Sequence, residues 1–532
     1  MTDRRTFLRS LGALALAGCA SNDPPLPPGE LLGPDLARGH RLTVGDFPPV
    51  AETRRVNVLI VGAGISGLSA AWRLSRLAVD DFLVLEMERE PGGNSRGGQS
   101  PLSAFPWGAH YLPLPGPGAQ HVRELLAETG VLQGPADALK PRYDERFLCA
   151  TPQERLFRHG LWEEGLLPQR GIDAAERDQQ HRFQAHMQTL KTQRGRDGRR
   201  VFALPMATAS RDPAWLALDR PSFRDWLLAE GYTAPSLHWL ANYACRDDYG
   251  TDYARTSAWA GLHYFACRDG EAANASPDTV ITAPDGNAWL MRALLKSTSE
   301  RLLTDAFVWR LESRKQGLTV DVLHDGKTLR IEARQVIWAA PHFILPKVWV
   351  NAPAGLPGMV EGLSYAPWLV ANLHLSARPI ERHGASPAWD NVLFDSAGLG
   401  YVDAQHQALR RHPGGTVLTW YRAFSELDPA AARRALRDQP RAAWAEQALS
   451  ELARVLPDIR QKTTRVDIFR HGHAMARPTP GSLFGGRRAR ALAFAHPHLS
   501  LAHADLSGFS LFEEAQDRGV RAADTVRRRL HG

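Results

Sequence analysis

Residues 58–67, with the sequence VLIVGAGISG, decide the fold of this chain. The apolar run 58–61 is typical of a buried parallel strand. Gly62, Gly64 and Gly67 follow at the spacing G-x-G-x-x-G, and apolar side chains then recur at helical spacing. The pattern predicts a strand, a tight glycine turn and a helix, which form the first half of a dinucleotide-binding unit.

The three glycines have separate geometric roles in such a unit. The first allows the tight turn, the second lets the backbone approach a pyrophosphate, and the third lets the helix pack closely on the strand. The pyrophosphate would bind at the positive end of the helix. We therefore expect a nucleotide to bind along Gly62, Ala63, Gly64, Ile65, Ser66 and Gly67.

A second strand is predicted at 82–85, and Glu86 follows it. An acid about 20 residues beyond the glycine turn accepts hydrogen bonds from an adenosine ribose. Its charge would also repel a 2'-phosphate, so the sequence disfavours NADP.

The next segment, Glu90-Pro-Gly-Gly-Asn-Ser-Arg96, indicates which nucleotide binds. It resembles the second glycine motif of the superfamily of flavin-containing amine oxidases and phytoene desaturases. In that superfamily the paired glycines and an arginine hold the pyrophosphate of FAD. The resemblance assigns this role to Gly92 and Gly93. Asn94 stands where the arginine is usual, so Arg96 is expected to contact the phosphate.

Later segments extend the resemblance. Val308 matches a position whose backbone contacts adenine. Asp505 matches an acid that binds the ribityl chain, and Phe509 and Ser510 match the start of a helix that faces the flavin pyrimidine. The end of such a helix would stabilise negative charge on the reduced flavin. No cysteine lies near this turn, so FAD is expected to bind noncovalently.

The resemblance implies an α/β fold with two parts. A Rossmann-like FAD-binding domain is expected from 54–130, 276–350 and 478–532. An inserted α+β substrate domain is expected from 131–275 and 351–477. The length of 532 residues is sufficient for both.

Two side chains are candidates for catalysis. His110 lies in the segment 105–111, which in the superfamily passes near the flavin ring, although a packed or capping histidine would give the same sequence. Superfamily amine oxidases often carry a lysine on the strand matching 368–375; this chain has none there, and Asn372 is the expected substitute. His471-Gly-His473 has no carboxylate or cysteine nearby, so no metal site is predicted.

The first 19 residues are predicted to be a targeting signal. Arg4 and Arg5 with the apolar run behind them resemble a signal for the twin-arginine export machinery, and 16–19 resembles a lipobox. By that resemblance Cys19 is lipidated and anchors the exported chain on the periplasmic side of a membrane. The proline-rich stretch 20–53 would be an extended tether. Alanine after Cys19, rather than the aspartate of inner-membrane lipoproteins, mildly favours the outer membrane.

Three cysteines remain beyond the lipobox, so at most one disulfide can form among them, and a pairing of Cys245 with Cys267 stays open. The net charge of +7 is spread over many arginines and few lysines, and no basic stripe with interleaved aromatic residues is present, which argues against a nucleic-acid partner.

The sequence therefore predicts an FAD-dependent oxidoreductase that takes a hydride from a small organic substrate and passes electrons to dioxygen or a quinone. An amine or polyamine is the favoured substrate, and the missing lysine is the weak point of this interpretation. A desaturase or isomerase of a lipid-like substrate is an alternative. A flavin-binding lipoprotein without turnover is a third.

Overall fold

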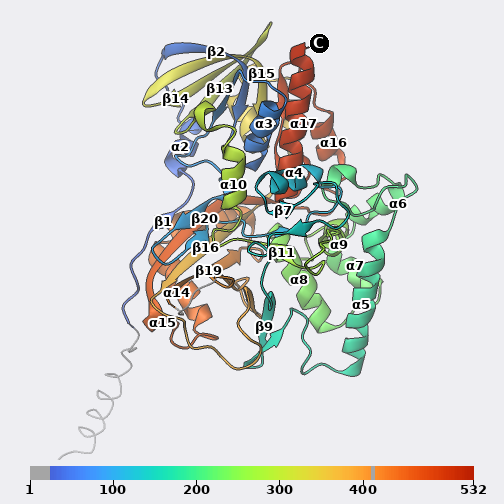
Figure 1. Ribbon diagram of the computed structural model, residues 1–532. Helices are drawn as coiled ribbons and strands as arrows, with labels where there is room; N and C mark the ends of the chain where they lie inside the picture. The colour runs from blue at the N-terminus through green and yellow to red at the C-terminus, as the bar shows by residue number, and fades with distance from the viewer. Residues whose placement is uncertain (1–23, 409–413, 532) are drawn as a thin grey trace, which may run out of the picture.

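The computed structural model describes residues 24–408 and 414–531. The predicted export signal, with Cys19, lies outside the described residues. Figure 1 shows one sheet at the top with helices α3 and α17 beside it, a second sheet at the lower left, and a group of helices at the lower right. The helices are α2 (Leu36–His40), α3 (Ile65–Arg76), α4 (Gln120–Glu128), α5 (Ala174–Thr192), α6 (Pro213–Leu216), α7 (Phe223–Ala229), α8 (Pro235–Tyr249), α9 (Ala258–Ala266), α10 (Ala288–Leu295), α11 (Leu345–Val348), α12 (Leu356–Val360), α13 (Pro429–Asp438), α14 (Arg441–Leu452), α15 (Ile459–Lys462), α16 (Gly486–Ala493) and α17 (Phe512–His531).

The upper sheet is assembled from segments far apart in the chain. Its strands are β2 (Val50–Val61), β3 (Phe82–Leu85), β12 (Leu302–Leu303), β13 (Phe307–Arg314), β14 (Gly317–His324), β15 (Lys327–Trp338) and β21 (Leu499–Leu501), in the order β12-β3-β2-β15-β14-β13 with β21 paired to β15. The pairs β12–β3, β3–β2, β2–β15 and β15–β21 are parallel. Val61 therefore lies beside Leu85 and Trp338 at one edge of the sheet, where ligands bind in open α/β sheets.

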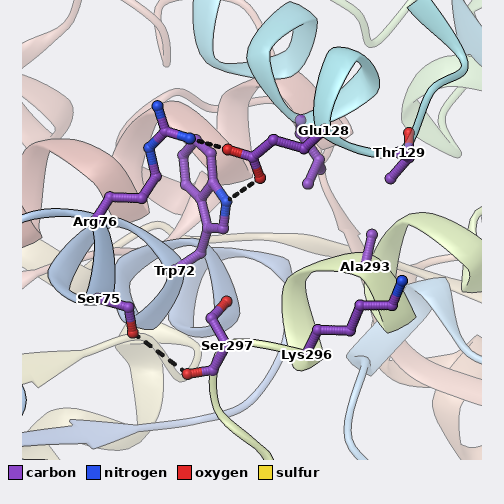
Figure 2. A pocket seen from close by; sticks show the side chains of 9 residues that line it. Trp72, Ser75, Arg76, Glu128, Thr129, Ala293, Lys296 and Ser297 are labelled. Atoms are coloured by element: carbon purple, nitrogen blue, oxygen red, sulfur yellow. Dashed lines mark hydrogen bonds and ion pairs between the residues drawn. The ribbon is translucent and has the colours of Figure 1, made fainter.

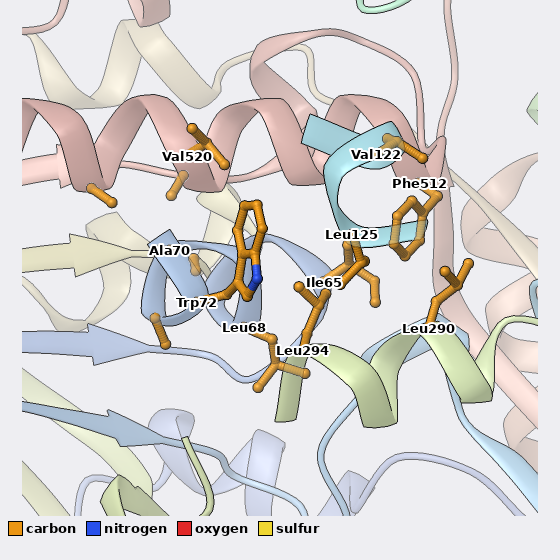
Figure 3. Close-up of a cluster of buried hydrophobic side chains, with 14 of the residues drawn as sticks. Ile65, Leu68, Ala70, Trp72, Val122, Leu125, Leu290, Leu294, Phe512 and Val520 are labelled. Atoms are coloured by element: carbon orange, nitrogen blue, oxygen red, sulfur yellow. The ribbon is translucent and has the colours of Figure 1, made fainter. Parts of the chain in front are cut away.

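Helices α3, α10 and α17 cover one face of this sheet, and α4 packs beside them. Figure 3 shows the apolar contact, with Leu68 and Trp72 of α3, Leu125 of α4 and Leu294 of α10 in one buried cluster. Burying each such side chain stabilises the fold by about 1.5–3 kcal/mol. The helices α3 and α17 cross in direct backbone contact, because a Cβ on Gly519 would overlap the carbonyl oxygen of Ser66.

The lower sheet contains eight strands. They are β1 (Leu31–Leu32), β9 (Glu154–Arg158), β10 (Leu161–Glu164), β16 (Tyr365–Leu375), β17 (Asp390–Leu393), β18 (Tyr401–Asp403), β19 (Thr416–Ala423) and β20 (Thr463–Ala476), in the order β1-β20-β16-β19-β18-β17-β9-β10. Helices α13 and α14 pack on β16 and β20. Three two-stranded ribbons complete the strands: β4 (Gly97–Gln99) with β5 (Ala104–Pro106), β6 (Leu112–Pro113) with β11 (Val280–Ile281), and β7 (Leu132–Gln133) with β8 (Arg142–Tyr143).

The helices α5, α7, α8 and α9 form a layer with an aromatic core of its own. This core includes Phe223 and Trp259, and it also receives Phe509 from the loop before α17. Many of the aromatic residues between 120 and 275 are thus helical core. The mixture of two sheets and helical layers confirms the predicted α/β class with an inserted α+β part.

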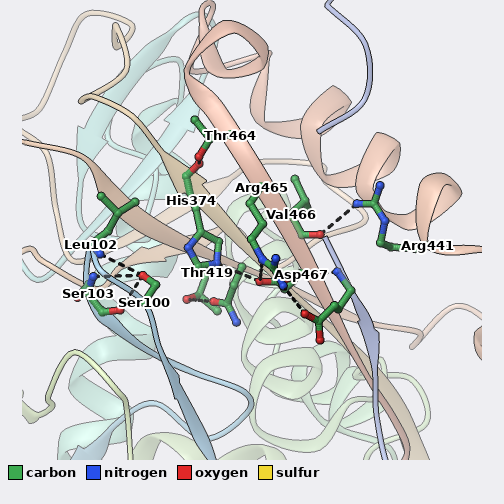
Figure 4. Close-up of polar contacts among 12 residues, drawn as sticks. Ser100, Leu102, Ser103, His374, Thr419, Arg441, Thr464, Arg465, Val466 and Asp467 are labelled. Carbon is green, nitrogen blue, oxygen red and sulfur yellow. Dashed lines mark hydrogen bonds and ion pairs between the residues drawn. The ribbon is translucent and has the colours of Figure 1, made fainter. Parts of the chain in front are cut away.

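The described part of the predicted tether differs from a free linker. Leu31 and Leu32 pair in parallel with β20, and the carbonyls of Pro28 and Glu30 accept the N–H groups of Val466 (2.8 Å) and Ile468 (2.9 Å). Figure 4 shows Arg441 donating to the carbonyl of Val466. This segment covers the edge of β20, which would otherwise expose unpaired backbone groups. Across 24–408 and 414–531, no helix combines the length and apolarity needed to span a membrane.

Candidate functional site

The first glycine turn has a different environment at each glycine. Gly62 has φ +101°, in the left-handed region, and a Cβ there would lie 3.0 Å from the carbonyl carbon of Ala339. A Cβ on Gly67 would overlap the carbonyl oxygen of Gly62, so this glycine is required for the packing of α3 on β2. Gly64 instead faces open space, since an added Cβ would meet no atom within 4 Å.

The side chains inside the turn belong to the protein interior. Ala63 and Ile65 are buried in the apolar cluster beneath α3. The hydroxyl of Ser66 donates to the carbonyl of Ala515 at 2.9 Å, which ties α3 to α17. These residues can therefore contact a nucleotide only through their backbone.

The second glycine turn packs against the first. Gly92 (φ +118°) and Gly93 (φ +55°) are both in conformations that favour glycine. The N–H of Gly92 donates to the carbonyl of Ala63 at 2.8 Å, and a Cβ on Gly93 would lie 3.4 Å from the Cα of Gly64. Two glycine turns and the N-terminus of α3 thus converge on one opening. Such a cradle of backbone amides at a helix N-terminus suits a phosphate group.

Glu86 lies beside this cradle. Its carboxylate accepts the N–H of Ala63 at 2.9 Å and that of Glu88 at 3.0 Å, and burial raises its pKa. A carboxylate offers about four acceptor positions, so two remain for the hydroxyls of a ribose. The backbone of Glu86 also bonds to Leu303 (2.9 Å) and Ala306 (2.8 Å), and the chain then leads into β13 at Val308.

Asn94 and Arg96 follow the second turn. The amide of Asn94 donates to the carbonyl of Ala474 at 2.6 Å, and this side chain lines the central cavity. Arg96 donates to the carbonyl of Gly93 at 3.1 Å, and its guanidinium lies 5.0 Å from the centre of the Phe469 ring. Among the described residues no carboxylate pairs with Arg96, so its charge is available to a phosphate.

The central cavity lies where the two sheets and the helical layer meet, and it has a volume of about 140 Å³. One wall is aromatic, one is charged, and one comes from the loops beside the glycine turns and from the start of α17. The aromatic wall consists of His110, Tyr111, Trp368 and Tyr421. The charged wall consists of Asp247, Asp248, Arg268 and Glu513. The third wall includes Asn94, Gly108, Ala109, Ser510, Leu511 and Phe512.

His110 belongs to the aromatic wall. Its ring stacks on Tyr421 with 4.5 Å between centroids and lies 5.5 Å from the ring of Trp389. Burial lowers the pKa of His110 to about 4, so the imidazole is neutral at pH 7. Its position fits a contact with substrate, whereas its low basicity makes it a poor proton acceptor.

Asn372 lies outside the cavity, and here the prediction needs correction. Its amide donates to the carbonyl of Pro106 at 3.0 Å and its oxygen accepts the hydroxyl of Thr419 at 2.6 Å. The side chain is fully buried, with both polar atoms occupied, so Asn372 links β16 to its neighbours and does not reach a substrate. Trp368 and Val370 are the residues through which β16 reaches the cavity.

The polar network next to Asn372 is structural as well. His374, two residues along β16, lies 3.2 Å from a carboxylate oxygen of Asp467 on β20, and Arg465 donates to the same oxygen at 2.7 Å. Figure 4 shows these side chains bridging the two strands. Asp467 in turn accepts the N–H of Glu30, which fastens the N-terminal segment.

The three C-terminal candidates, Asp505, Phe509 and Ser510, have different surroundings. Asp505 is 1% exposed, and one carboxylate oxygen accepts the N–H of His342 (3.0 Å) and the hydroxyl of Tyr365 (2.5 Å). Burial opposes its charge, but His503 and these partners hold the pKa of Asp505 well below its usual range. Its Oδ1 is buried without a hydrogen-bond partner in the described chain, and Asp505 is not among the residues that line the cavity, so the ribityl contact stays a prediction.

The side chain of Phe509 does not lie at the cavity, contrary to the prediction. It is buried in the helical layer, where its ring stacks on His263 at 4.8 Å. Ser510, the next residue, does line the cavity, and its hydroxyl accepts the N–H of Ala476 at 2.9 Å. The helix α17 begins two residues later, so its positive end lies at the cavity wall, as predicted for a helix that stabilises a negative charge.

The charged wall was not predicted from the sequence. Asp248 on α8 lies 3.6 Å from Arg268 and accepts the hydroxyl of Tyr111 at 3.3 Å, and Arg268 donates to that hydroxyl at 2.9 Å. Asp247 has no hydrogen-bond partner among the described residues. Glu513 is 3% exposed, and its Oε1 is buried without a hydrogen-bond partner in the described chain. The acidic doublet among aromatic residues in α8 is the sequence signal that could have indicated this wall.

Neither the histidines nor the cysteines of the described residues form a second functional site. Among the described residues, no group of His, Cys, Asp and Glu is arranged to hold a metal ion; His471 bonds to the carbonyl of Trp107 at 2.7 Å. The thiols of Cys149, Cys245 and Cys267 are free and buried.

A surface depression lies between the C-terminal end of α3 and helices α4 and α10, on the side of α3 opposite Gly64. Figure 2 shows Trp72 and Arg76 both bonded to Glu128, and Ser75 donating to the carbonyl of Ser297. These contacts join three helices, and among the described residues that line the depression Lys296 is the one charged side chain without an ion-pair partner.

Comparisons with known proteins agree with this architecture. Residues 60–129 match the family described as NAD(P)-binding Rossmann-like domain. A stretch of 53 residues is 47% identical to polyamine oxidase 7 of Oryza sativa subsp. japonica, and this match spans only 10% of the chain and 11% of that protein.

Solved structures match over most of the chain. Putrescine oxidase bound to putrescine gives a TM-score of 0.66 at 17% identity, over 90% of this chain and 100% of the other. Cyclohexylamine oxidase from Brevibacterium oxydans IH-35A gives 0.62 at 16% identity over 90% and 100%, and a CLA-producing fatty acid isomerase from P. acnes gives 0.59 at 12% over 89% and 98%. The chain thus has the mixed α/β fold of amine oxidase-like FAD enzymes, with a Rossmann-like domain.

Proposed function

We propose that this protein is an FAD-dependent oxidoreductase that oxidises an alkylamine or polyamine. The observation that carries the proposal is the central cavity, in which aromatic faces and an excess of carboxylates lie beside two glycine turns shaped for a dinucleotide. The putrescine and cyclohexylamine oxidases that share the fold support this choice of substrate.

The charge of the cavity selects for a cation. Asp247, Asp248 and Glu513 line it, against a single guanidinium, that of Arg268, which is already held by Asp248 and Tyr111. An alkylammonium would gain Coulomb attraction from the carboxylates and cation–π contact with the rings of the aromatic wall.

FAD fits the glycine turns, and noncovalent binding is part of the proposal. Gly64 and Gly93 leave room for the pyrophosphate, Arg96 offers an unpaired charge, and Glu86 offers two acceptor positions for the ribose. When bound, FAD supplies the oxidant that accepts a hydride from the carbon next to nitrogen. The chain itself orients the amine, excludes water and moves its protons.

A lipid-like substrate is a weaker candidate. The fatty acid isomerase with the same fold supports it, but a carboxylate would meet three acids and no unpaired guanidinium or ammonium among the described residues lining the cavity. A flavin-binding protein without turnover is disfavoured because such a protein has no need of buried carboxylates in its cavity, whose desolvation is costly.

We also propose that the chain is exported through the twin-arginine route and anchored by a lipid at Cys19 on the periplasmic side. The order of the two N-terminal motifs supports this. A flavin protein folded in the cytoplasm suits a route that carries folded chains, and a quinone or dioxygen would then accept the electrons.

An anaerobic titration tests the proposed activity. The chain from residue 24 onward, purified with FAD, is mixed with putrescine, a monoamine such as benzylamine, and an unsaturated fatty acid, while absorbance near the flavin maximum is followed. We expect bleaching by amines alone. Bleaching by the fatty acid alone would refute the amine proposal, and a flavin that no compound reduces would refute turnover.

A further inference from the structure

The proposed oxidation requires a proton acceptor in the cavity. An amine reaches the carboxylates as an ammonium ion, yet hydride loss from carbon needs the nitrogen lone pair to stabilise the product. A proton must therefore leave the nitrogen after binding and before oxidation. The identity of the group that takes this proton rests on the proposed function.

Most groups on the cavity wall are unsuited to this task. His110 is stacked between aromatic rings, and its low pKa, about 4, makes the imidazole a weak base. Arg268 carries no lone pair to accept a proton. Asp248 is already bound to Arg268 and to the hydroxyl of Tyr111, and these two partners oppose the rise in its pKa that burial causes.

Asp247 differs from Asp248 because its carboxylate has no partner among the described residues. It lines the same cavity from α8, and no described residue donates a hydrogen bond to it or pairs with it. Its charge raises the pKa values of Tyr111 and Tyr421, after the larger effect of burial, so the carboxylate lies close to the aromatic wall where an ammonium would bind. A free carboxylate next to an aromatic cage is positioned to receive a proton from the bound nitrogen.

We propose that Asp247 accepts the proton of the substrate ammonium and that Asp248, held in place by Arg268 and Tyr111, is its fixed neighbour. One N–H bond of the ammonium breaks, an O–H bond forms on the Asp247 carboxylate, and the nitrogen keeps the electron pair. Two adjacent acids whose environments separate their protonation behaviour commonly divide the acid–base roles of a site in this way.

The charges around Asp247 determine the pH range in which its carboxylate can accept a proton. Burial, the charge of Asp248 and that of Glu154 raise the pKa of Asp247 to about 7, while Arg268 and Arg246 oppose the rise. After the larger effect of burial, the charge of Asp247 in turn raises the pKa values of Asp390 on β17 and of Tyr111, Tyr243, Tyr264 and Tyr421. The base form is therefore gained as pH rises through about 7. A general base is most effective when its pKa lies near the working pH.

Glu513 is the competing acceptor. It is buried in the first turn of α17, and burial raises its pKa to about 7 as well. Its charged neighbours are Glu514, Arg268 and Asp248. Glu513 belongs to the same charged wall but comes from the start of α17 rather than from α8, so Glu513→Gln is the comparison variant.

The test compares Asp247→Asn with Glu513→Gln in the FAD-loaded protein. The rate of anaerobic flavin reduction at saturating putrescine is measured from about pH 6 to about pH 9, and Asp247→Asn is expected to lose about 100-fold near pH 7 and to recover as the free amine becomes abundant. Asp247→Glu should restore part of the rate. The assignment would be overturned if Asp247→Asn kept the wild-type pH dependence of the reduction rate. It would also be overturned if only Glu513→Gln lost that pH dependence.

A second readout requires no turnover. Tetramethylammonium has no N–H, so any proton released on its binding comes from the protein. Calorimetry in two buffers should show release of about half a proton per site near pH 7 in the wild type, because a bound cation favours the ionised carboxylate, and less in Asp247→Asn.

The possible failures are distinguishable. A wild type that no amine reduces overturns the proposed function together with this inference. A wild type that amines reduce, with equal proton release in wild type and Asp247→Asn, overturns the inference alone. If Asp247→Asn does not fold, the wild-type profile is measured with amines of different basicity. If the pH at which the reduction rate rises follows the pKa of the amine instead of staying near 7, a carboxylate acceptor is excluded.

Discussion

The substitutions Gly67→Ala and Gly64→Ala should separate the stability of the fold from cofactor binding, although the two glycines lie in one turn. In Gly67→Ala the new methyl group would overlap the carbonyl oxygen of Gly62 and lie 3.3 Å from the Cβ of Ala339. Helix α3 would have to move away from β2. Overpacking of a core costs about 1–3 kcal/mol, and backbone overlap places this variant at the upper end.

Gly64→Ala should have the opposite effect. Its φ of −73° suits alanine, and an added Cβ meets no protein atom within 4 Å. The loss of a glycine N-cap costs at most about 1 kcal/mol of stability. The methyl group would instead occupy the space of the pyrophosphate, at about 1–3 kcal/mol, which corresponds to a loss of about 5- to 150-fold in FAD affinity.

The assay measures both quantities on the same samples. Urea unfolding of the apoprotein gives the free energy of unfolding, and quenching of flavin fluorescence gives the dissociation constant for FAD. Wild-type FAD affinity in Gly64→Ala would refute the proposed path of the cofactor. Wild-type stability in Gly67→Ala would refute the close contact of α3 with β2.

Three further outcomes are expected. Glu86→Ala leaves the N–H groups of Ala63 and Glu88 without their acceptor, so apoprotein stability should fall by about 1–3 kcal/mol and FAD affinity by about 10-fold, measured by the same two assays. Asp247→Asn should stabilise the apoprotein by about 1–3 kcal/mol above pH 7, because the raised folded-state pKa of Asp247 means that folding disfavours its ionised form; this gain should shrink from pH 7 to pH 4 and vanish below, and an equal gain at low pH would contradict it. Arg4→Lys combined with Arg5→Lys should leave unprocessed precursor in the cytoplasm, detected by fractionation and immunoblotting, and normal lipid attachment would argue against the twin-arginine route.

The sequence was most informative where function depends on local spacing. Gly62, Gly64 and Gly67 are close in the chain, so one short pattern specifies the strand, the turn and the helix together. The fold class followed from this unit and from the later segments that resemble the same superfamily. The expected strand 368–375 was also found, within β16.

Prediction failed where a single-residue offset decides which way a side chain points. Phe509 is buried in the helical layer and Ser510 lines the cavity, although they are adjacent. The reason is different for Asn372, which lies on the same face of β16 as Val370 but two residues further on, where the carbonyl of Pro106 and the hydroxyl of Thr419 occupy its polar atoms. The charged wall was missed for another reason. Asp248 and Arg268 come together only through the packing of α8 and α9, which no spacing in the sequence specifies.

If Cys19 carries the lipid that we propose, the docking of the N-terminal segment on β20 limits the distance between the protein and the membrane. Pro27 is buried and its carbonyl accepts a hydrogen bond from Arg441, so the first fixed point lies eight residues after Cys19. At about 3.6 Å per residue the intervening chain reaches at most about 29 Å. With the lipid at Cys19 that we propose, the protein would be held close to the bilayer, with the β20 edge of its lower sheet toward the membrane. Its orientation relative to the membrane would therefore be restricted. A membrane-soluble electron acceptor would then meet a limited part of the protein surface.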